Sequence, residues 1–234
     1  MWLYGHHAVL AALANPDRRI ERILAMKDVA ERHATELKVR KDIKTEIMSR
    51  DAMTERLPGG AVHQGLAVLA APLEDAVLED VLARCADHAL VLALDQVTDP
   101  HNVGAILRTC AAFNVTALVA TARHSPEASA VLFKSASGAF EHVPFVKVTN
   151  LSRAMAELKD YGFRILGLDS DAPEDISAVD RAPPVAIVLG AEGKGLRQLT
   201  RDSCDHLVRL DMNGPIRSLN VSNACAVTLY ALTR

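Results

Sequence analysis

A series of short apolar runs in the second two thirds of the chain constrains its fold more than any other feature. The runs are ALVLAL, TALVA, VPFVKV, RILGL, VAIVL and HLVRL, at residues 89–94, 116–120, 143–148, 164–168, 185–189 and 206–210. Strands that helices cover on both faces have this pattern, because neither face meets water. Helical patterns lie between the runs, at residues 103–113, 127–140, 151–161, 196–204 and 219–232. The alternation predicts a doubly wound α/β domain with a mostly parallel sheet.

The beginning of the chain has a different pattern, in which short helical and strand segments follow one another closely. Helical patterns at residues 6–14, 29–39 and 49–57 alternate with strand patterns at residues 22–26, 44–48 and 63–70. Proline and glycine mark the ends of several of these segments. We therefore expect a small α/β domain over residues 1–71, a partly helical linker over residues 72–87, and the larger α/β domain over residues 88–234.

The charge balance excludes a strongly basic nucleic-acid-binding protein. The 234 residues contain 26 Lys and Arg against 29 Asp and Glu, which gives a net charge of −3. Residues 1–72 are slightly basic, with eleven Lys and Arg against nine Asp and Glu. Contacts to a nucleic acid would therefore need a local patch.

Cysteine usage and the N-terminal sequence indicate the cellular compartment. Cys85, Cys110, Cys204 and Cys225 lie far apart, and none has the spacing of a zinc site. We expect these cysteines to be reduced and buried, and we expect no bound metal. The segment WLYGHHAVLAAL lacks the features of a signal peptide, and no apolar run is long enough to span a bilayer. These features predict a cytoplasmic protein without a membrane anchor.

Three turns that follow apolar runs carry unusual polar residues, where sheets of this kind bind ligands. The first turn begins the segment DQVTDPHNVGAILRTCAAF, residues 95–113. Arg108 lies four residues after Gly104 on the predicted helix, so its side chain can reach back toward Asn102. An amide and a guanidinium at a helix start suit a phosphate group. An ordinary helix cap with a surface arginine explains the same pattern equally well.

The second turn, in VAIVLGAEGKGLRQL at residues 185–199, has three glycines within six residues, with Glu192 and Lys194 between them. Glycines allow a tight turn and close approach of the backbone to a ligand. The pattern is neither a P-loop nor a dinucleotide fingerprint. A nucleotide-like ligand and a simple strand-to-helix loop both remain open.

The third turn begins the C-terminal helical pattern, in GPIRSLNVSNACAVTLY at residues 214–230. Apolar and small residues recur there at helical spacing, at Val221, Ala224, Cys225, Thr228, Leu229 and Leu232. The opposite side is small and mildly polar, so we expect a helix that is buried on most sides, at a subunit interface. Ser218 and Asn220 lie where this helix begins. One of them suffices as a cap, so the excess of polar residues favours a site.

Together, these three turns resemble the motifs of the SpoU family, also called TrmH, of RNA ribose 2'-O-methyltransferases in the SPOUT superfamily. The matching stretches are DPHNVGAILRT, GAEGKGL and SLNVS, in family order, and GAFEHVPFVKV at residues 138–148 is also similar. YGHHAVLAAL and HQGLAV are similar to the frequent N-terminal RNA-binding domain of the family, which is of the ribosomal-protein L30e type. The resemblance covers nearly the whole chain.

The resemblance implies a C-terminal trefoil knot that binds S-adenosylmethionine, and a homodimer whose active site uses both subunits. By position, the implied cofactor contacts are Gly190, Leu210 and Leu219. The implied active-site set is Asn102, Arg108, Glu192, Ser218 and Asn220. The family usually has proline at the position of Asp211. We expect this departure to change the affinity for the cofactor. Family analogy makes Arg108 the base, but a guanidinium stays protonated in proteins. We favour a role for Arg108 in positioning the RNA phosphate.

The two-part chain resembles the enzymes that modify a guanosine of 23S rRNA more than the tRNA-modifying relatives. Arg18, Arg19 and Arg22 are our candidates for contacts to RNA phosphates, although a solvated charged surface also explains them. Two alternatives are a tRNA methyltransferase of the same family and a catalytically silent RNA-binding or ribosome-assembly factor. A nicotinamide-dependent oxidoreductase is a third alternative, but the chain lacks a dinucleotide fingerprint near a first strand.

Overall fold

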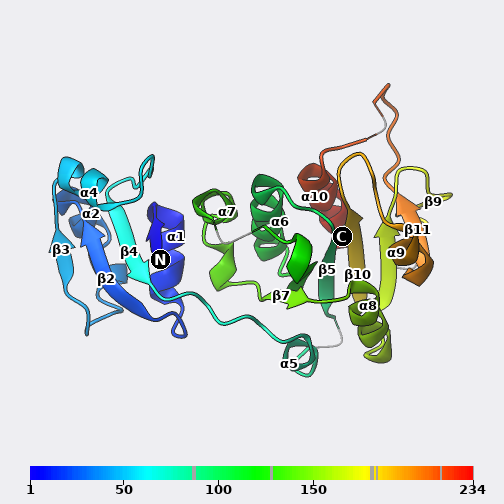
Figure 1. Cartoon of the computed structure of the whole chain (residues 1–234), viewed down its shortest axis with the longest axis horizontal. Coiled ribbons are helices and arrows are strands. Elements are labelled where there is room, and N and C mark those ends of the chain that lie inside the picture. The colour runs from blue at the N-terminus through cyan, green and yellow to red at the C-terminus, as the bar shows by residue number, and fades with distance from the viewer. Residues whose placement is uncertain (86–87, 127–128, 180–181, 183, 217, 234) are drawn as a thin grey trace. The chain divides into compact units, whose positions relative to one another are not determined.

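The chain divides into two compact units in a computed structural model that describes residues 1–85, 88–126, 129–179, 182, 184–216 and 218–233 (Figure 1). The first unit contains residues 1–74 and 136–142, and the second contains residues 75–135 and 143–234. Our expected division placed residues 136–142 in the second domain, whereas they group with the first unit. None of the described helices is long and apolar enough to cross a membrane.

The first unit is a mixed sheet with short helices. Its elements are β1 (Trp2–Tyr4), α1 (His6–Ala14), β2 (Ile20–Ala25), α2 (Lys27–Arg32), α3 (Ala34–Leu37), β3 (Thr45–Ile47), α4 (Arg50–Arg56), β4 (Leu66–Ala70) and the 3-10 helix η2 (Ala139–Glu141). The strand order is β1-β4-β2-β3, in which only β2 and β3 pair in parallel. The sequence pattern predicts all of these elements except β1, which is too short to show a period, and η2. The helix expected over residues 29–39 is two short helices.

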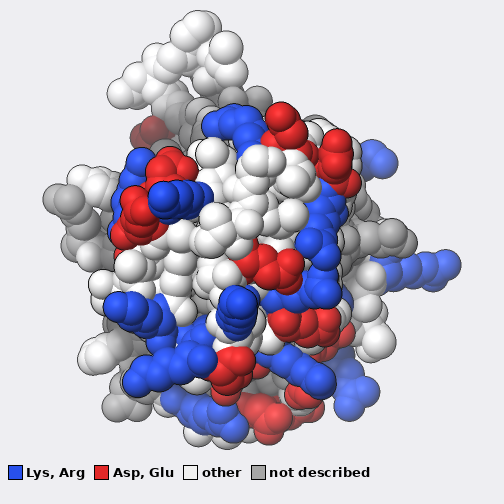
Figure 2. Space-filling view, turned by 90° about the vertical axis from the view of Figure 1, so that its left-hand side faces the viewer, with Lys and Arg blue, Asp and Glu red and all other residues white. Residues whose placement is uncertain are grey.

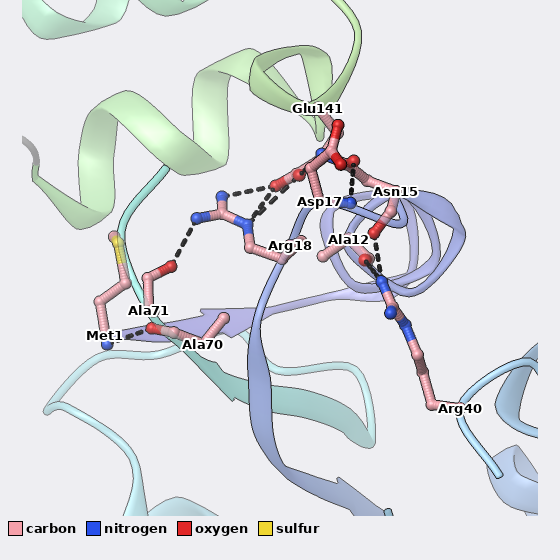
Figure 3. A network of polar contacts seen from close by, with 9 residues as sticks. All are labelled: Met1, Ala12, Asn15, Asp17, Arg18, Arg40, Ala70, Ala71 and Glu141. Carbon is pink, nitrogen blue, oxygen red and sulfur yellow. Dashed lines mark hydrogen bonds and ion pairs between the residues drawn. The ribbon is translucent and has the colours of Figure 1, made fainter. Parts of the chain in front are cut away.

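The end of α1 is held by Arg40, which lies in the segment between α3 and β3. Its guanidinium donates from Nε to the carbonyl oxygen of Leu13 at 3.0 Å. It also donates to the carbonyl oxygen of Asn15 (Figure 3). The last carbonyls of a helix have no partner within the helix, and a basic side chain there satisfies them. This contact fixes where the chain turns toward β2.

The second unit is a seven-stranded parallel sheet with helices. Its elements are α5 (Leu78–Leu82), β5 (Leu90–Asp95), α6 (Pro100–Ala112), β6 (Ala117–Thr121), the 3-10 helix η1 (Ala122–His124), α7 (Ala130–Ala136), β7 (Phe145–Val148), α8 (Leu151–Asp160), β8 (Arg164–Leu168), β9 (Glu174–Asp175), β10 (Val185–Gly190), α9 (Gln198–Ser203), β11 (His206–Arg209) and α10 (Val221–Leu232). The order β7-β6-β5-β10-β8-β11-β9 contains parallel pairs throughout. The predicted parallel α/β sheet is confirmed.

Both faces of this sheet are buried, which explains the apolar runs. Val91 and Val188 belong to a core cluster with residues of α5 and α8, such as Leu78 and Leu151. The alternate strand residues, such as Leu92, are equally buried. Successive side chains of a strand point to opposite faces, so a second layer must cover that other face. Helices α6 and α10 pack against each other and contact β6 and β10 there (Figure 1).

The structure shortens one predicted helix. We expected a helix over residues 127–140, of which residues 127 and 128 lie outside the described part, and α7 ends at Ala136. Ser137 and Gly138 follow with φ angles of 50° and 89°. Two successive residues with positive φ cannot continue a right-handed helix, so the chain turns into η2.

Candidate functional site

A cleft of about 420 Å³ lies at the carboxyl ends of β8, β10 and β11 in the second unit. Its walls are residues 168–171 after β8, residues 189–195 at the end of β10, and Leu210 and Met212 after β11. Arg201 of α9 and four residues at the start of α10 complete it, namely Ser218, Leu219, Val221 and Ala224. This is the sheet edge where α/β proteins bind ligands.

The glycine-rich turn after β10 forms one wall of the cleft and can be built only from glycine at its start. A Cβ atom on Gly190 would lie 2.2 Å from the carbonyl carbon of Gly195. The turn closes on itself, because the Gly195 N–H donates to the Ala191 carbonyl at 2.8 Å. Gly193 and Gly195 have φ angles of 74° and 65°, which favour glycine. The three glycines are therefore required by the backbone of the turn itself.

Glu192, in the middle of this turn, joins the other two sequence motifs. Its Oε1 accepts from Nδ2 of Asn102, at the start of α6, at 3.2 Å. The same oxygen accepts from Nδ2 of Asn220 and, at 3.4 Å, from the N–H of Val221. Asn220 Nδ2 also donates to Asn102 Oδ1 at 3.0 Å. Three segments that are far apart in the sequence thus meet at one carboxylate oxygen.

The helix caps decide between the two explanations of the first and third turns. At α6 the cap is Asp99, which accepts from the N–H of His101 at 3.0 Å, so Asn102 is not the cap. At α10 the cap is Asn220, whose Oδ1 accepts from the N–H of Ser222 at 2.9 Å. Capping uses only the oxygen of Asn220, and its amide nitrogen remains for Glu192. Capping alone does not account for either asparagine.

The other expected site residues lie in and around the same region, with one exception. Gly190, Leu210 and Leu219, the implied cofactor contacts, line the cleft, as do Glu192 and Ser218.

Arg108 is the exception. It does not line the cleft, and its side chain is exposed. Within the described part of the chain, no hydrogen bond or ion pair of Arg108 is found, including to Asn102. The structure does not bring its guanidinium to Asn102, which lies six residues earlier on α6.

Two carboxylates that directly follow apolar strands escaped our sequence analysis. Asp169, after β8, pairs with Arg201 in the wall of the cleft. Asp95, at the end of β5, is fully buried and binds Arg197. Each is the first acidic residue after an apolar run, and this position was the available signal. Carboxylates are also common in turns, so this position alone does not distinguish a site residue from a turn residue.

Asp211, the departure from the family pattern, does not project into the cleft. Its neighbours Leu210 and Met212 line the cleft, while the Asp211 side chain is 70 % exposed. Its N–H donates to Oδ2 of Asp175 at 3.0 Å, a bond that proline could not make. Hydrogen bonds from Ser177, supported by this N–H, hold the pKa of Asp175 below its usual value. Aspartate in place of proline thus adds a backbone hydrogen bond to Asp175 and places no charge in the cleft.

Arg18, one of the expected RNA contacts, is buried in the first unit and already paired, so this expectation needs correction. Its Nη2 lies 2.5 Å from Oε1 of Glu141, and its Nη1 donates to the Ala71 carbonyl at 2.7 Å (Figure 3). Asn15 Nδ2 donates to the other oxygen of Glu141 at 2.8 Å. Because the pair is almost completely buried, Arg18 cannot reach a phosphate in this conformation.

Arg19 and Arg22, the other two candidates, are exposed. Nε of Arg22 lies 3.8 Å from Glu46, which also pairs with Arg56 at 3.3 Å. Figure 2 shows basic and acidic side chains interspersed on the surface that it views. Such exposed pairs are weak and leave their arginines available to a stronger anion.

Metal binding has no support in the described residues, among which no group of three His, Cys, Asp or Glu side chains could hold an ion. All four cysteines are free, and Cys110 and Cys225 are buried. A hydrogen bond with Cys225, together with burial, holds the pKa of Cys110 well above its usual value. These two thiols therefore behave as core residues.

Both units match known sequence families. A profile of the SpoU rRNA Methylase family matches residues 89–230, and a profile described as RNA 2'-O ribose methyltransferase substrate binding matches residues 2–76. The 23S rRNA (guanosine-2'-O-)-methyltransferase of Vibrio cholerae is 40% identical over 99% of this chain and 96% of its own. The enzyme of the same name from Nitrosomonas europaea is 38% identical over 100% of this chain and 91% of its own. An uncharacterized tRNA/rRNA methyltransferase of Synechocystis is 37% identical over 99% of this chain, which spans 62% of it.

Solved structures with the same fold include two that contain AdoMet. The SpoU methyltransferase AviRb from Streptomyces viridochromogenes matches with a TM-score of 0.81 at 22% identity, over 100% of this chain and 89% of that chain. An AdoMet-bound rRNA methyltransferase from Sinorhizobium meliloti matches with a TM-score of 0.80 at 20% identity, over 99% of this chain and 85% of that chain. At these identities the likeness concerns the fold.

Proposed function

Because the chain belongs to the SpoU rRNA methylase family, we propose that it methylates the 2'-hydroxyl of a ribose in RNA, and specifically that of a guanosine in 23S rRNA. The two family profiles together cover both units. Relatives that are 38% and 40% identical over nearly their whole length are named for this reaction. An rRNA substrate would place the protein in the cytoplasm.

The methyl donor in this proposal is S-adenosylmethionine, and the cleft suits it. Its volume of about 420 Å³ lies within the range of small-molecule sites. Apolar side chains such as Leu168 and Leu189 suit a purine, while the carboxylate of Asp171 suits a ligand with sulfonium and ammonium charges. Residues Gly190, Leu210 and Leu219 would hold the cofactor.

Orientation is the main task of the protein in this reaction. When bound, the cofactor supplies a methyl group that its sulfonium charge already activates. Asn102, Ser218 and Asn220 would orient the acceptor ribose and the turns of the cleft. Glu192 holds the two asparagines, since its Oε1 accepts from both of them. Arg108 would position the RNA phosphate, because its side chain is exposed and a guanidinium stays protonated.

The proton of the 2'-hydroxyl must leave as the new bond forms, and Glu192 is our candidate to receive it. The three N–H donors that bind Glu192 all use Oε1. Among the described residues, Oε2 has no hydrogen-bond donor, and Glu192 lines the cleft. A carboxylate can accept a proton at neutral pH, whereas a guanidinium cannot.

A homodimer and a C-terminal knot complete the proposal. Four large apolar side chains around the start and outer side of α10 are between 41% and 72% exposed, namely Ile216, Leu219, Val227 and Tyr230. An apolar group of this kind marks a protein interface. The contacts of Asn220 and Val221 with Glu192 support a chain end that is held within the cofactor turn.

The observation that carries the function is the meeting of Asn102, Glu192 and Asn220 beside the cleft. The test is to incubate the protein with methyl-labelled S-adenosylmethionine and either 23S rRNA or tRNA, and to map the labelled ribose. We expect label on one guanosine of 23S rRNA. Label on tRNA alone would identify a tRNA enzyme, and RNA binding without label would identify a silent RNA-binding factor.

The role of Glu192 is tested by Glu192→Gln, with Arg108→Lys as the comparison. Gln keeps an acceptor for the two asparagines but cannot take a proton. We expect Glu192→Gln to bind the cofactor and to lower kcat by about 10²-fold or more, and Arg108→Lys to raise KM for RNA. An unchanged kcat in Glu192→Gln would exclude Glu192 as the proton acceptor.

A further inference from the structure

Asp95 is a buried carboxylate that the proposed reaction does not use. It is the last residue of β5 and is fully buried. Oδ2 accepts from the backbone N–H of Arg197 at 2.9 Å, and Oδ1 accepts from Arg197 Nε at 2.6 Å. Both oxygens therefore bind one residue, which lies 102 positions later in the chain.

The position of Asp95 in the sheet relates it to both ends of the glycine-rich turn. In the pairing of β5 with β10, Asp95 is opposite Gly190, where the turn begins. Arg197, where the turn has ended and α9 is about to start, is the residue that Asp95 binds. One side chain therefore fixes the distance between the two ends of a wall of the cleft.

Stability alone does not explain such an arrangement. Burying a carboxylate costs more free energy than most buried ion pairs return, and the side chain of Arg197 remains 46% exposed. The backbone next to Asp95 is also unusual, because Gln96 has a φ angle of 61°. A costly charge beside a strained residue is typical of a site that needs a fixed geometry.

We propose that Asp95 is a positioning residue for the cofactor cleft, which it holds in shape before the ligand arrives. This inference rests on the proposed function. A turn that is already in its binding conformation loses less entropy when a ligand binds. Asp95 therefore acts on the affinity for S-adenosylmethionine and not on the methyl transfer itself.

The matched control is Asp205, a carboxylate with similar contacts at the opposite edge of the sheet. Its Oδ2 accepts from the N–H of Ile165 at 2.8 Å, and its Oδ1 accepts from Lys159 Nζ at 2.6 Å. Ile165 lies near the start of β8, whereas the cleft lies beyond the strand's end. Asp205→Asn therefore removes the same kind of tie at a distance from the cleft.

The experiment compares Asp95→Asn, Arg197→Ala and Asp205→Asn in two measurements. In the cofactor-free protein, amide exchange of residues 191–196 should be faster in Asp95→Asn, faster by less in Arg197→Ala, and unchanged in Asp205→Asn. The Kd for S-adenosylmethionine should rise about tenfold or more in Asp95→Asn, while kcat at saturating cofactor stays within about twofold of the wild type.

Two results would overturn the inference about Asp95. One is wild-type exchange and affinity in Asp95→Asn. The other is an equal loss of affinity in Asp205→Asn, which would show a general effect of stability. If Asp95→Asn does not fold, amide exchange of residues 191–196 in Arg197→Ala tests the inference instead, because this variant keeps the carboxylate of Asp95. If the wild-type protein itself binds no S-adenosylmethionine, the proposed function fails, and amide exchange alone decides about Asp95.

Discussion

At the scale of single residues, Glu192 shows what the sequence could reveal. Three turns after apolar runs directed attention to one edge of the sheet, and the resemblance to the SpoU family implied that Asn102, Glu192 and Asn220 share a site. In the structure these three side chains are joined by hydrogen bonds. Arg18 shows the limit, since its partner Glu141 lies 123 residues later and no local pattern relates them. The partner of Asp95, Arg197, likewise lies 102 residues later, so only the position of Asp95 after an apolar run could have marked it.

Gly190→Ala should destroy the cleft. The added Cβ would lie 2.2 Å from a backbone carbon of Gly195, which no side-chain movement can relieve. We expect the variant to lose cofactor binding and about 1–3 kcal/mol or more of unfolding free energy. Calorimetry of binding and thermal denaturation measure the two effects. Gly214→Ala is the control, because a Cβ there meets no atom within 4 Å.

His63 should make the first unit sensitive to acid. Its Nδ1 accepts from the N–H of Gly65 at 3.0 Å, so a proton on Nδ1 would break this bond. Burial, assisted by the positive charge of Arg50, lowers the pKa of His63. Below about pH 6.5 the unfolded chain therefore binds a proton at His63 that the folded chain does not bind. The free energy of unfolding falls as the pH decreases toward the pKa of His63 in the folded state.

The measurement for His63 is the melting temperature between pH 7.5 and 5.5. The wild type should lose more stability over this range than His63→Gln. His88→Gln changes an exposed histidine and should follow the wild type. Equal slopes in the wild type and His63→Gln would contradict the prediction.

At the scale of elements, α10 agrees with its sequence pattern on one side only. Of the predicted stripe, Val221, Ala224, Cys225, Thr228 and Leu229 are buried, and Leu232, at the end of the helix, is only partly buried. We also expected burial on most other sides, but Val227 and Tyr230 are 47% and 50% exposed in the single chain. Helical spacing identifies the face toward the core, but it does not show what covers the other face. We propose that a second subunit covers Val227 and its surroundings.

Val227→Lys should weaken the proposed dimer. A buried lysine without a partner is costly, so an interface that covers α10 would dissociate. Analytical ultracentrifugation should show a dimer for the wild type and a monomer for the variant. Val62→Lys, on a valine of the first unit that is 55% exposed, should leave the dimer intact. A monomeric wild type would refute the dimer.

At the scale of the whole molecule, the chain passes from one unit to the other more often than its sequence indicates. We expected one linker, but residues 136–142 return to the first unit. A Cβ on Gly138 would lie 2.9 Å from the Cβ of Ala11, which shows how closely this segment packs on α1. Similarity of GAFEHVPFVKV to its family marked the segment without showing where it packs.

A fragment of residues 1–74 should therefore be less stable than the same unit in the full chain. Without Glu141, the buried guanidinium of Arg18 loses its counter-ion, which costs about 3–5 kcal/mol. Urea denaturation followed by circular dichroism measures this loss. Arg18→Met should stabilise the fragment, because it removes the unpaired charge, and should destabilise the full chain. A fragment as stable as the full-length unit would contradict the importance of the pair.

The return of residues 136–142 also sets an order of events during synthesis. Ribosomes build a protein from its N-terminus, and domains generally fold in that order as they emerge. The first unit here cannot close around Arg18 when its own strands have been made, because Glu141 has not yet been translated. Helices α5, α6 and α7 and strands β5 and β6 must all emerge before it does. The N-terminal unit thus begins folding first but finishes only after part of its neighbour exists.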